Sequence, residues 1–264
     1  MSNIYMPERG EILSIVQESP IEWLFKVKTT IKPAPGQFIQ LSIHMVGEAP
    51  ISVANYNHDE EWIEFLIRKV GKVTDAIFNL QPGDSIFLRG AYGNCFPMDT
   101  YSGKRVIVVA GGSGTAPVRP LIKHFIDDEN TDIELIFGFK DQESILFKKE
   151  IDEWRKKAPM ILTVDKGCGI DGECVGLVTE YIPHLKMYEN FDNLEVVIVG
   201  PPMMMKYSAL EFLKLGIPED KIWVSFERNM SCAVGKCGHC KIDETYVCLE
   251  GPIFNYVKAK TLLD

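Results

Sequence analysis

The sequence predicts a β plus α/β protein: an antiparallel β-barrel, then a doubly wound parallel sheet, then a small C-terminal segment. Three observations support this fold class. Short runs rich in β-branched and aromatic residues, separated by turn residues, fill the first hundred positions. Continuous apolar runs then alternate with helical patterns, as in parallel sheets that are buried on both faces. Near the C-terminus, four of the seven cysteines fall within a short stretch that has little regular pattern.

The composition is that of a globular protein with room for more than one core: 264 residues, 46% hydrophobic and 25% charged. The formal net charge of -9 argues against nucleic acid as the main partner. The N-terminus lacks a signal-peptide pattern, and no apolar run approaches the roughly 18 residues of a membrane helix. These features predict a cytoplasmic chain without a membrane segment. In that reducing compartment, clustered cysteines are more often metal or redox ligands than disulfides.

The predicted barrel covers residues 1–100. Its strand patterns are "EILSIVQES", "EWLFKVKTT", "QFIQLSIHM", "EWIEFLIRKV" and "DSIFLRGAY". In the fourth of these, Ile63, Phe65 and Ile67 share one face, while Glu64 and Arg68 lie on the other. The turn residues "KPAPG" and "QPGD" separate neighbouring runs, and one helix is expected at about residues 74–80. Short strands at this spacing predict an antiparallel barrel or sandwich.

The predicted parallel sheet covers residues 101–226, and a glycine-rich loop follows its first strand. In "VVAGGSGTAPVRPL", Gly111, Gly112 and Gly114 precede a helix that begins near Thr115 and has Pro117 in its first turn. Glycines let the backbone approach a diphosphate, and a helix N-terminus offers free N–H groups. The alternative is a tight strand-to-helix turn with no ligand.

A second loop, "GPP", follows the apolar run "LEVVIV". Both loops come at the carboxyl ends of strands, where open α/β sheets bind their ligands. We therefore expect a nucleotide to contact both loops. The expected contacts are Gly111, Gly112, Gly114, Thr115, Ala116, Pro117, Gly200 and Pro201.

The predicted C-terminal segment, residues 227–264, contains the spacing C-x4-C-x2-C-x7-C at Cys232, Cys237, Cys240 and Cys248. The first three positions match the plant-type ferredoxin spacing, which indicates a [2Fe–2S] cluster. A structural zinc site is the alternative, although such sites more often use two CxxC pairs. His239 is expected to be a solvent-facing or partner-facing neighbour rather than a ligand. Of the remaining cysteines, Cys95 is expected to be a packed thiol, and Cys168 and Cys174 to be incidental.

A β-domain, a nucleotide sheet and a four-cysteine loop in this order resemble one branch of the ferredoxin–NADP reductase superfamily, the iron–sulfur electron-transfer subunits. The branch includes the electron-transfer subunit of dihydroorotate dehydrogenase, the gamma subunits of NAD(P)-linked hydrogenases and the corresponding subunit of anaerobic sulfite reductase. The stretches "ERNMSCAVGKCGHC" and "YVCLEGPIFNYVKAKTLLD" resemble the sulfite reductase subunit most. The resemblance covers essentially the whole chain.

The resemblance implies that the barrel binds FAD. The family signature R-P-x-S matches "APIS", with Ala49 in place of the arginine and Ser52 placed near flavin N5. Arg68 is the expected replacement for that arginine. The stretch "IRKVGKVT" matches the family element whose N–H groups face the FAD diphosphate. The positions carried over are Pro50, Ile51, Ser52, Ile67, Arg68, Gly71, Lys72, Val73 and Thr74.

The resemblance also implies an electron path. Hydride delivers two electrons and a cluster accepts one at a time, so flavin stands between them. NADH is expected to reduce FAD, which passes electrons to the cluster and on to a partner catalytic subunit, with or without a further iron–sulfur subunit. Sulfite reductase that forms sulfide is the favoured partner. Dihydroorotate dehydrogenase or hydrogenase is the alternative, and a non-redox zinc-binding module is the rival of another class.

Coenzyme choice depends on the end of "LIFGF". Asp141 follows this strand, where it could meet a ribose hydroxyl and repel a 2′-phosphate. The neighbouring Lys140 argues the other way. NADH is therefore the expected coenzyme, with NADPH left open, and no catalytic acid or nucleophile is expected.

Overall fold

The computed structural model describes residues 4–166, 173–185 and 193–262, and it divides into two compact units. The first comprises Met1–Phe96 with Glu227–Pro252, and the second comprises Pro97–Phe226 with Ile253–Asp264. Residues 227–264, expected to form one segment, therefore contribute to both units. The domain boundaries at residues 100 and 226 stay predictions from the sequence.

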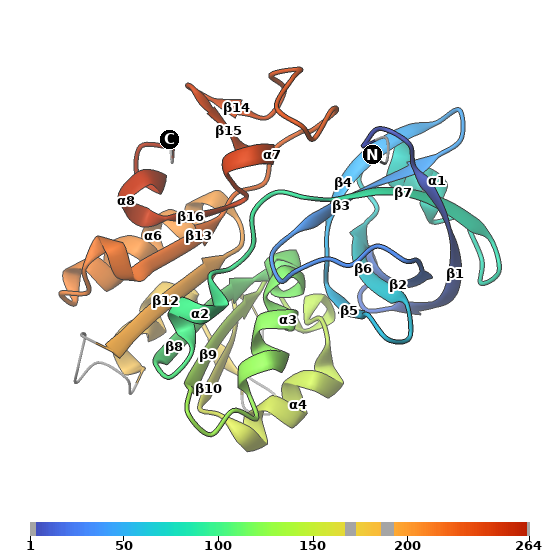
Figure 1. Cartoon of the computed structure of the whole chain (residues 1–264). Coiled ribbons are helices and arrows are strands. Elements are labelled where there is room, and N and C mark those ends of the chain that lie inside the picture. The colour runs from blue at the N-terminus through green and yellow to red at the C-terminus, as the bar shows by residue number, and fades with distance from the viewer. Residues whose placement is uncertain (1–3, 167–172, 186–192, 263–264) are drawn as a thin grey trace. The chain divides into compact units, whose positions relative to one another are not determined.

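The first unit is built on an antiparallel β-barrel whose seven strands have the order β4-β3-β7-β1-β2-β6-β5 (Figure 1). The strands are β1 (Glu8–Gln17), β2 (Glu22–Lys28), β3 (Phe38–Ile43), β4 (Gly47–Ser52), β5 (Asn55–Asn57), β6 (Trp62–Arg68) and β7 (Ser85–Tyr92). The alternation predicted for β6 is confirmed, because Ile63, Phe65 and Ile67 are fully buried and Arg68 is exposed. These three side chains join residues of β1, β2, β3 and β7 in one apolar cluster that fills the barrel.

The barrel helix α1 (Lys72–Ile77) begins earlier and ends earlier than the predicted helix at residues 74–80. The reason lies in the helix start. The Thr74 hydroxyl oxygen accepts hydrogen bonds from the backbone N–H groups of Val70 and Gly71, both at 3.0 Å. Thr74 therefore occupies the third position of a capping box rather than the first helical position.

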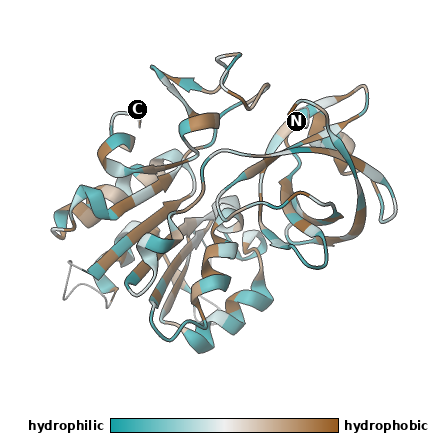
Figure 2. Ribbon diagram, viewed as in Figure 1, coloured by the Kyte–Doolittle hydropathy of each residue, from teal (hydrophilic) through white to brown (hydrophobic). Residues whose placement is uncertain are grey.

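The second unit holds a seven-stranded sheet of order β11-β10-β9-β8-β12-β13-β16. Its strands are β8 (Arg105–Gly111), β9 (Asp132–Phe139), β10 (Met160–Val164), β11 (Cys174–Val175), β12 (Leu194–Val199), β13 (Ile222–Ser225) and β16 (Ile253–Asn255). Neighbouring strands are parallel except for β16, which runs antiparallel to β13. All of β12 is buried, and Figure 2 shows hydrophobic residues along the central strands. The predicted parallel sheet is thus confirmed.

Helices cover both faces of this sheet. On β9, the Phe137 ring packs edge-on against Trp154 of α4 (Lys148–Lys157), with 6.0 Å between ring centroids. A Cβ atom on the next residue, Gly138, would lie 2.5 Å from Val178 of α5 (Val178–Tyr181). Successive strand residues point to opposite faces, so α4 and α5 lie on opposite sides. Among the described residues of the unit, the other helices are α2 (Met98–Tyr101), η1 (Gly112–Gly114), α3 (Thr115–Phe125), η2 (Gln142–Ser144), η4 (Ile182–His184), α6 (Pro202–Lys214), η7 (Glu219–Lys221) and α8 (Tyr256–Ala259).

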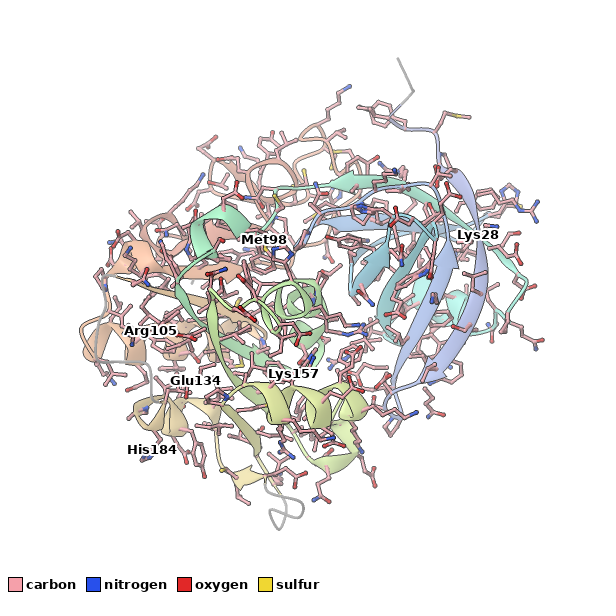
Figure 3. All side chains as sticks on the ribbon, turned by 60° about the horizontal axis from the view of Figure 1, so that its bottom comes forward. Lys28, Met98, Arg105, Glu134, Lys157 and His184 are labelled. Carbon is pink, nitrogen blue, oxygen red and sulfur yellow. The ribbon has the colours of Figure 1, made fainter. Side chains whose placement is uncertain are left out.

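The helices have the character of surface elements. In Figure 2, α4 is largely hydrophilic along the side that faces the viewer. Its last residue, Lys157, is labelled in Figure 3, and its ammonium nitrogen lies 2.7 Å from the Asp127 carboxylate. Within the described ranges, no helix has both the length and the apolar character needed to cross a membrane.

The cysteine segment lies between β13 and β16 in the chain. It consists of an irregular loop, a short hairpin of β14 (Lys241–Ile242) and β15 (Thr245–Tyr246), and one helical turn, α7 (Val247–Glu250). Within the first unit, the amide of Asn94 donates to the Glu250 carbonyl at 2.9 Å, and its backbone N–H donates to the Gly251 carbonyl at 2.7 Å. These bonds fasten the end of the cysteine segment to the chain that leaves β7.

Candidate cofactor sites

The glycine loop and the "GPP" loop meet at one edge of the parallel sheet. Strands β8 and β12 are hydrogen-bonded neighbours, with Ala110 opposite Val199 at their carboxyl ends. Helix α3 begins directly after the first loop and α6 directly after the second. Two helix N-termini therefore open at the same edge, which is the arrangement that favours an anionic ligand.

Close packing explains the glycines at this edge. A Cβ atom on Gly114 would lie 2.6 Å from the Val199 carbonyl oxygen and 2.7 Å from the Cα of Gly200, so neither contact could yield easily. A Cβ on Gly111 would lie 2.3 Å from the Met204 sulfur. The two loops thus touch through their backbones.

The first turn of α3 offers a ligand backbone groups rather than side chains. Thr115, Ala116 and Pro117 are buried, and the Thr115 hydroxyl donates to the Gly112 carbonyl at 2.8 Å. At the second loop, Gly200 is half-buried and Pro201 is exposed. The structure therefore brings all eight predicted nucleotide contacts to one edge, although their contact with a nucleotide stays a prediction.

Asp141 stands at the carboxyl end of β9, on the same edge of the sheet. One of its carboxylate oxygens accepts from the Ser144 hydroxyl at 2.6 Å and from the Ser144 N–H at 3.0 Å. These bonds lower the pKa of Asp141, with the hydroxyl bond as the main cause. Asp165, after neighbouring β10, has a pKa that is raised chiefly by desolvation and further by the Asp141 charge. Asp141 therefore has a structural task, the capping of η2, besides the ribose contact predicted for it.

The flavin signature lies on strand β4. Pro50, Ile51 and Ser52 are half-buried and pair in register with Gln40, Ile39 and Phe38 of β3. Their half-buried side chains and the strand position fit a surface that a flat ligand covers.

Arg68, the expected substitute for the missing signature arginine, is already paired. Its Nε and Nη2 atoms donate to one Glu22 carboxylate oxygen at 2.8 and 2.6 Å. Glu22 is 3% exposed and lies directly across from Arg68 on the neighbouring strand. A buried carboxylate left without this partner would carry an uncompensated charge. Contact of Arg68 with a flavin phosphate stays a prediction. If Arg68 makes that contact, at least one of its N–H groups must still donate to Glu22, because the buried carboxylate needs this partner. Ile67 is fully buried in the apolar cluster of the barrel, so a flavin contact at this residue stays a prediction.

The turn before α1 presents backbone to solvent. The Thr74 hydroxyl donates to the Gly71 carbonyl at 3.0 Å, and no atom lies within 4 Å of a Cβ built on Gly71. Lys72 is exposed and Val73 is half-buried. The Thr74 side chain thus shapes the turn from inside, while the outer face of Gly71 is open.

The four clustered cysteines lie as two contacting pairs. The Cys237 thiol neighbours that of Cys232, and the Cys248 thiol neighbours that of Cys240. Backbone N–H groups point at the sulfurs: those of Lys236 and Cys237 lie 3.2 and 3.4 Å from the Cys232 sulfur. In the described part of the chain, no three His, Cys, Asp or Glu side chains form a group suited to one metal ion. Two neighbouring cysteine pairs with backbone N–H groups directed at their sulfurs fit a two-iron cluster better than a single zinc ion.

The two pairs differ in surroundings. Cys240 and Cys248 are buried, whereas Cys237 is exposed. The N–H of His239 donates to the Cys237 sulfur and is the main cause that lowers the pKa of Cys237 to about 7. Burial, followed by the neighbouring Cys240 thiol, raises the pKa of Cys248 to about 12. Cys237 is therefore the more readily deprotonated of these two cysteines, and Cys248 needs a metal ion to offset its thiolate charge.

The other described cysteines, Cys95 and Cys174, belong to other elements of the fold. Cys95 is exposed, so the expectation of a packed thiol is wrong; it lies in the loop that follows β7. Cys174 is half-buried at the start of β11, and Cys168 lies outside the described residues. His239 is exposed, in agreement with a solvent-facing neighbour.

Three family models match consecutive parts of the chain. Residues 19–96 match the oxidoreductase FAD-binding domain, and residues 108–209 match the oxidoreductase NAD-binding domain. Residues 227–259 match the iron–sulfur cluster binding domain of dihydroorotate dehydrogenase B.

Several relatives match this chain along most of its length. The gamma subunit of sulfhydrogenase 2 from Pyrococcus furiosus is 35% identical, covering 96% of this chain and 96% of the relative. A probable dihydroorotate dehydrogenase B electron transfer subunit from Methanocaldococcus jannaschii is 32% identical over 92% of this chain and 87% of the relative. The chain belongs to the ferredoxin–NADP reductase-like superfamily. A solved chain of NADH-dependent reduced ferredoxin–NADP oxidoreductase superposes with a TM-score of 0.79 at 25% identity, covering 96% of this chain and 92% of that one.

Membership in this superfamily settles the general chemistry. The chain is an electron-transfer subunit of the NAD(P)H-dependent flavin and iron–sulfur oxidoreductases, with domains for FAD, for NAD and for a [2Fe–2S] cluster. The partner expected first, sulfite reductase, is not supported: two sulfhydrogenase gamma subunits and a probable dihydroorotate dehydrogenase B electron transfer subunit are 31–35% identical to this chain over 88–99% of its length. The resemblance of two short C-terminal stretches was a weaker guide than identity along the whole chain.

One residue of this superfamily member was missed by the sequence analysis. Arg89 of β7 contacts the cysteine loop, since its guanidinium lies 2.9 Å from the carbonyl oxygen of Cys232. The signal available in the sequence was an arginine within the apolar strand pattern "SIFLRGAY". A charge inside such a run predicts a buried partner.

Proposed function

We propose that this chain delivers electrons from NADH to the catalytic subunit of a hydrogenase-type complex, through FAD and a [2Fe–2S] cluster. The observation that carries the proposal is the presence of all three cofactor domains in one chain that matches sulfhydrogenase gamma subunits at 35% and 33% identity over nearly its full length. The two cysteine pairs and the paired loops at the sheet edge support it with geometry.

In this proposal the barrel holds FAD at β4 and at the turn before α1. When bound, FAD exchanges the two electrons of a nicotinamide hydride for the single electrons that a cluster accepts. Ser52 donates a hydrogen bond near flavin N5, and Pro50 and Ile51 line the ring. The backbone N–H groups of Lys72, Val73 and Thr74 face the diphosphate at the start of α1, whereas the Gly71 N–H donates to the Thr74 hydroxyl.

The sheet edge of the second unit holds the coenzyme. The N-termini of α3 and α6 bind its diphosphate through backbone N–H groups. The close packing of Gly114 on Gly200 holds the two loops that precede these helices side by side. The Asp141 carboxylate accepts a hydrogen bond from a hydroxyl of the adenosine ribose, and its negative charge repels a 2′-phosphate. The side chains of this edge orient the coenzyme and transfer no proton.

Cys232, Cys237, Cys240 and Cys248 ligate the cluster as two pairs. The N–H groups that already point at the Cys232 sulfur stabilise thiolate charge there. Cys237 is the exposed member of the four, so it is the ligand nearest to solvent. A partner that accepts electrons from the cluster therefore docks on the side of the loop that carries Cys237.

Isolation of the native complex tests the partner. The chain should co-purify with a catalytic subunit, and the complex should reduce NAD+ or NADP+ with hydrogen as electron donor. Absence of hydrogen-linked activity, together with NADH-driven reduction of sulfite to sulfide, would contradict the proposal.

A dihydroorotate dehydrogenase partner is the second candidate. A specific observation favours it: the cluster-binding model that matches residues 227–259 is that of dihydroorotate dehydrogenase B. In that case the complex oxidises dihydroorotate with NAD+ and shows no reaction with hydrogen.

A further inference from the structure

Arg89 of β7 is a buried arginine with every donor in use. It is 6% exposed, and its guanidinium makes five hydrogen bonds within the first unit. Nε and Nη2 donate to the two Glu48 carboxylate oxygens, each at 2.7 Å. Nη1 donates to the Tyr92 hydroxyl at 3.1 Å. An arginine has five N–H donors, so none remains for another group.

The last two donors reach the cysteine loop. Nη2 donates to the Ser231 carbonyl at 2.6 Å, and Nη1 donates to the Cys232 carbonyl at 2.9 Å. Cys232 is the first of the four cluster cysteines. The guanidinium therefore holds the backbone by hydrogen bonds at Ser231 and Cys232, where the chain enters the cluster site.

The other end of the bidentate pair is the strand with the flavin signature. Glu48 lies on β4, two positions before Pro50, and β4 is separated from β7 only by β3. A second bond follows the same route, since the Gln40 amide of β3 donates to the Met230 carbonyl at 3.3 Å. Three neighbouring barrel strands are thus connected to the entry of the cysteine loop.

Charge pairing explains why this arrangement is stable. A buried guanidinium is costly unless it is paired and fully hydrogen-bonded, and Glu48 meets the first requirement. The Glu48 hydrogen bond is the main cause that raises the pKa of Arg89, so the group stays charged. The positive charge of Arg89 lies beside the carbonyl groups of Ser231 and Cys232. The negative charge of Glu48 pairs with the Nε and Nη2 atoms of the same guanidinium.

We infer that Arg89 is a positioning residue for the cluster: it fixes Cys232 relative to the flavin-binding strand, and the Arg89–Glu48 pair sets the electrostatic potential at that cysteine. The inference rests on the proposed function for the existence of a cluster at these cysteines. Lysine cannot replace Arg89, because its three donors cannot serve a carboxylate, a hydroxyl and two carbonyls in one plane.

The first test is Arg89→Lys in the full chain loaded with FAD and iron. We expect faster backbone hydrogen exchange at residues 231–238, a loss of bound iron and an altered electron paramagnetic resonance spectrum, with FAD content unchanged. Arg119→Lys is the matched control. Arg119 is 2% exposed and forms a similar bidentate pair, with Glu150, in the second unit, so this change should leave the iron content and the spectrum as in the parent.

The second test separates charge from mere attachment. Glu48→Gln removes a negative charge and should raise the reduction potential of the cluster, whereas Arg89→Gln leaves Glu48 uncompensated and should lower it. If the Arg89–Glu48 pair only holds the cysteine loop in place and has no electrostatic role, the two variants should change the reduction potential equally or not at all. Potentials are measured by redox titration followed by electron paramagnetic resonance.

The outcomes are distinguishable. A parent chain that binds no iron overturns the proposed function and this inference together. A parent with a cluster, combined with an Arg89→Lys variant of normal exchange, iron and spectrum, overturns this inference alone. If Arg89→Lys does not fold, Glu48→Gln decides the matter, and a potential equal to that of the parent overturns it.

Discussion

The nucleotide edge and the cysteine loop are both rich in glycine, yet Gly114 of the first and Gly238 of the second have different tasks. At the nucleotide edge, Gly114 is needed because a Cβ would lie 2.6 Å from a neighbouring carbonyl oxygen. In the cysteine loop, Gly238 has no atom within 4 Å of such a Cβ, but its φ of 78° lies in the left-handed region. The first site is a binding surface made by backbone packing, and the second is a turn that aims side chains.

This difference predicts how each site fails. A site made of backbone should fail through misfolding when a methyl group is added, with a graded loss of stability. A site made of thiol side chains should fail chemically while the fold persists. Four substitutions test the contrast, from the largest expected effect to the smallest.

The largest effect is expected from Cys240→Ser. Serine is a harder and far less readily deprotonated ligand than cysteine, so the chain should lose most of its iron. FAD and NADH bind to other elements, and NADH-driven reduction of a dye that accepts directly from flavin should survive within about twofold, while reduction of the partner collapses. Iron content and both rates are measured in one preparation. Equal loss of the two rates at normal flavin content would show that the cluster is not a separate step after FAD.

Gly114→Ala should destabilise the second unit by about 1–3 kcal/mol, as overpacking against fixed backbone does. NADH affinity should fall with it, whereas FAD and iron stay bound to the first unit. The measurement is chemical denaturation together with NADH titration. An unchanged stability with normal NADH binding would mean that the two loops do not pack as described.

Asp141→Ser should narrow the preference for NADH over NADPH about tenfold, which corresponds to roughly 1.4 kcal/mol of differential binding. Serine is also a good helix cap, so η2 should persist and only the charge is lost. The ratio of kcat/KM for the two coenzymes is the readout. A constant ratio would remove Asp141 from the coenzyme site and leave it as the cap of η2.

The smallest effect is expected from Gly71→Ala. The space beside this residue is open and its backbone is extended, so stability should change by about 0.5 kcal/mol or less. The N–H groups of Lys72, Val73 and Thr74, which we expect to face the diphosphate, remain, so FAD content should match that of the parent. Loss of FAD from a folded variant would contradict a diphosphate contact made through N–H groups alone.

The sequence predicted the elements whose residues carry a regular pattern. Strand β6 alternates, β8 and β12 are almost continuously apolar, and the first three clustered cysteines have the spacing of a known cluster motif. Local patterns do not contain long-range pairing, which explains the gaps. Arg68 was assigned to a ligand because its partner Glu22 lies 46 positions away, and Arg89 was passed over because Cys232 lies 143 positions away. Strand β16 was missed because three residues are too few for a period.

Strand β16 also bears on how such a molecule could have been assembled. Ser225 and Ile253 face each other in the β13–β16 pair, so the sheet holds the two ends of the intervening stretch together. An inserted stretch whose ends already meet adds little loop-closure entropy when its length changes. Related proteins could therefore gain, lose or exchange the metal-binding stretch between these two strands during evolution, while β13 and β16 continue to pair.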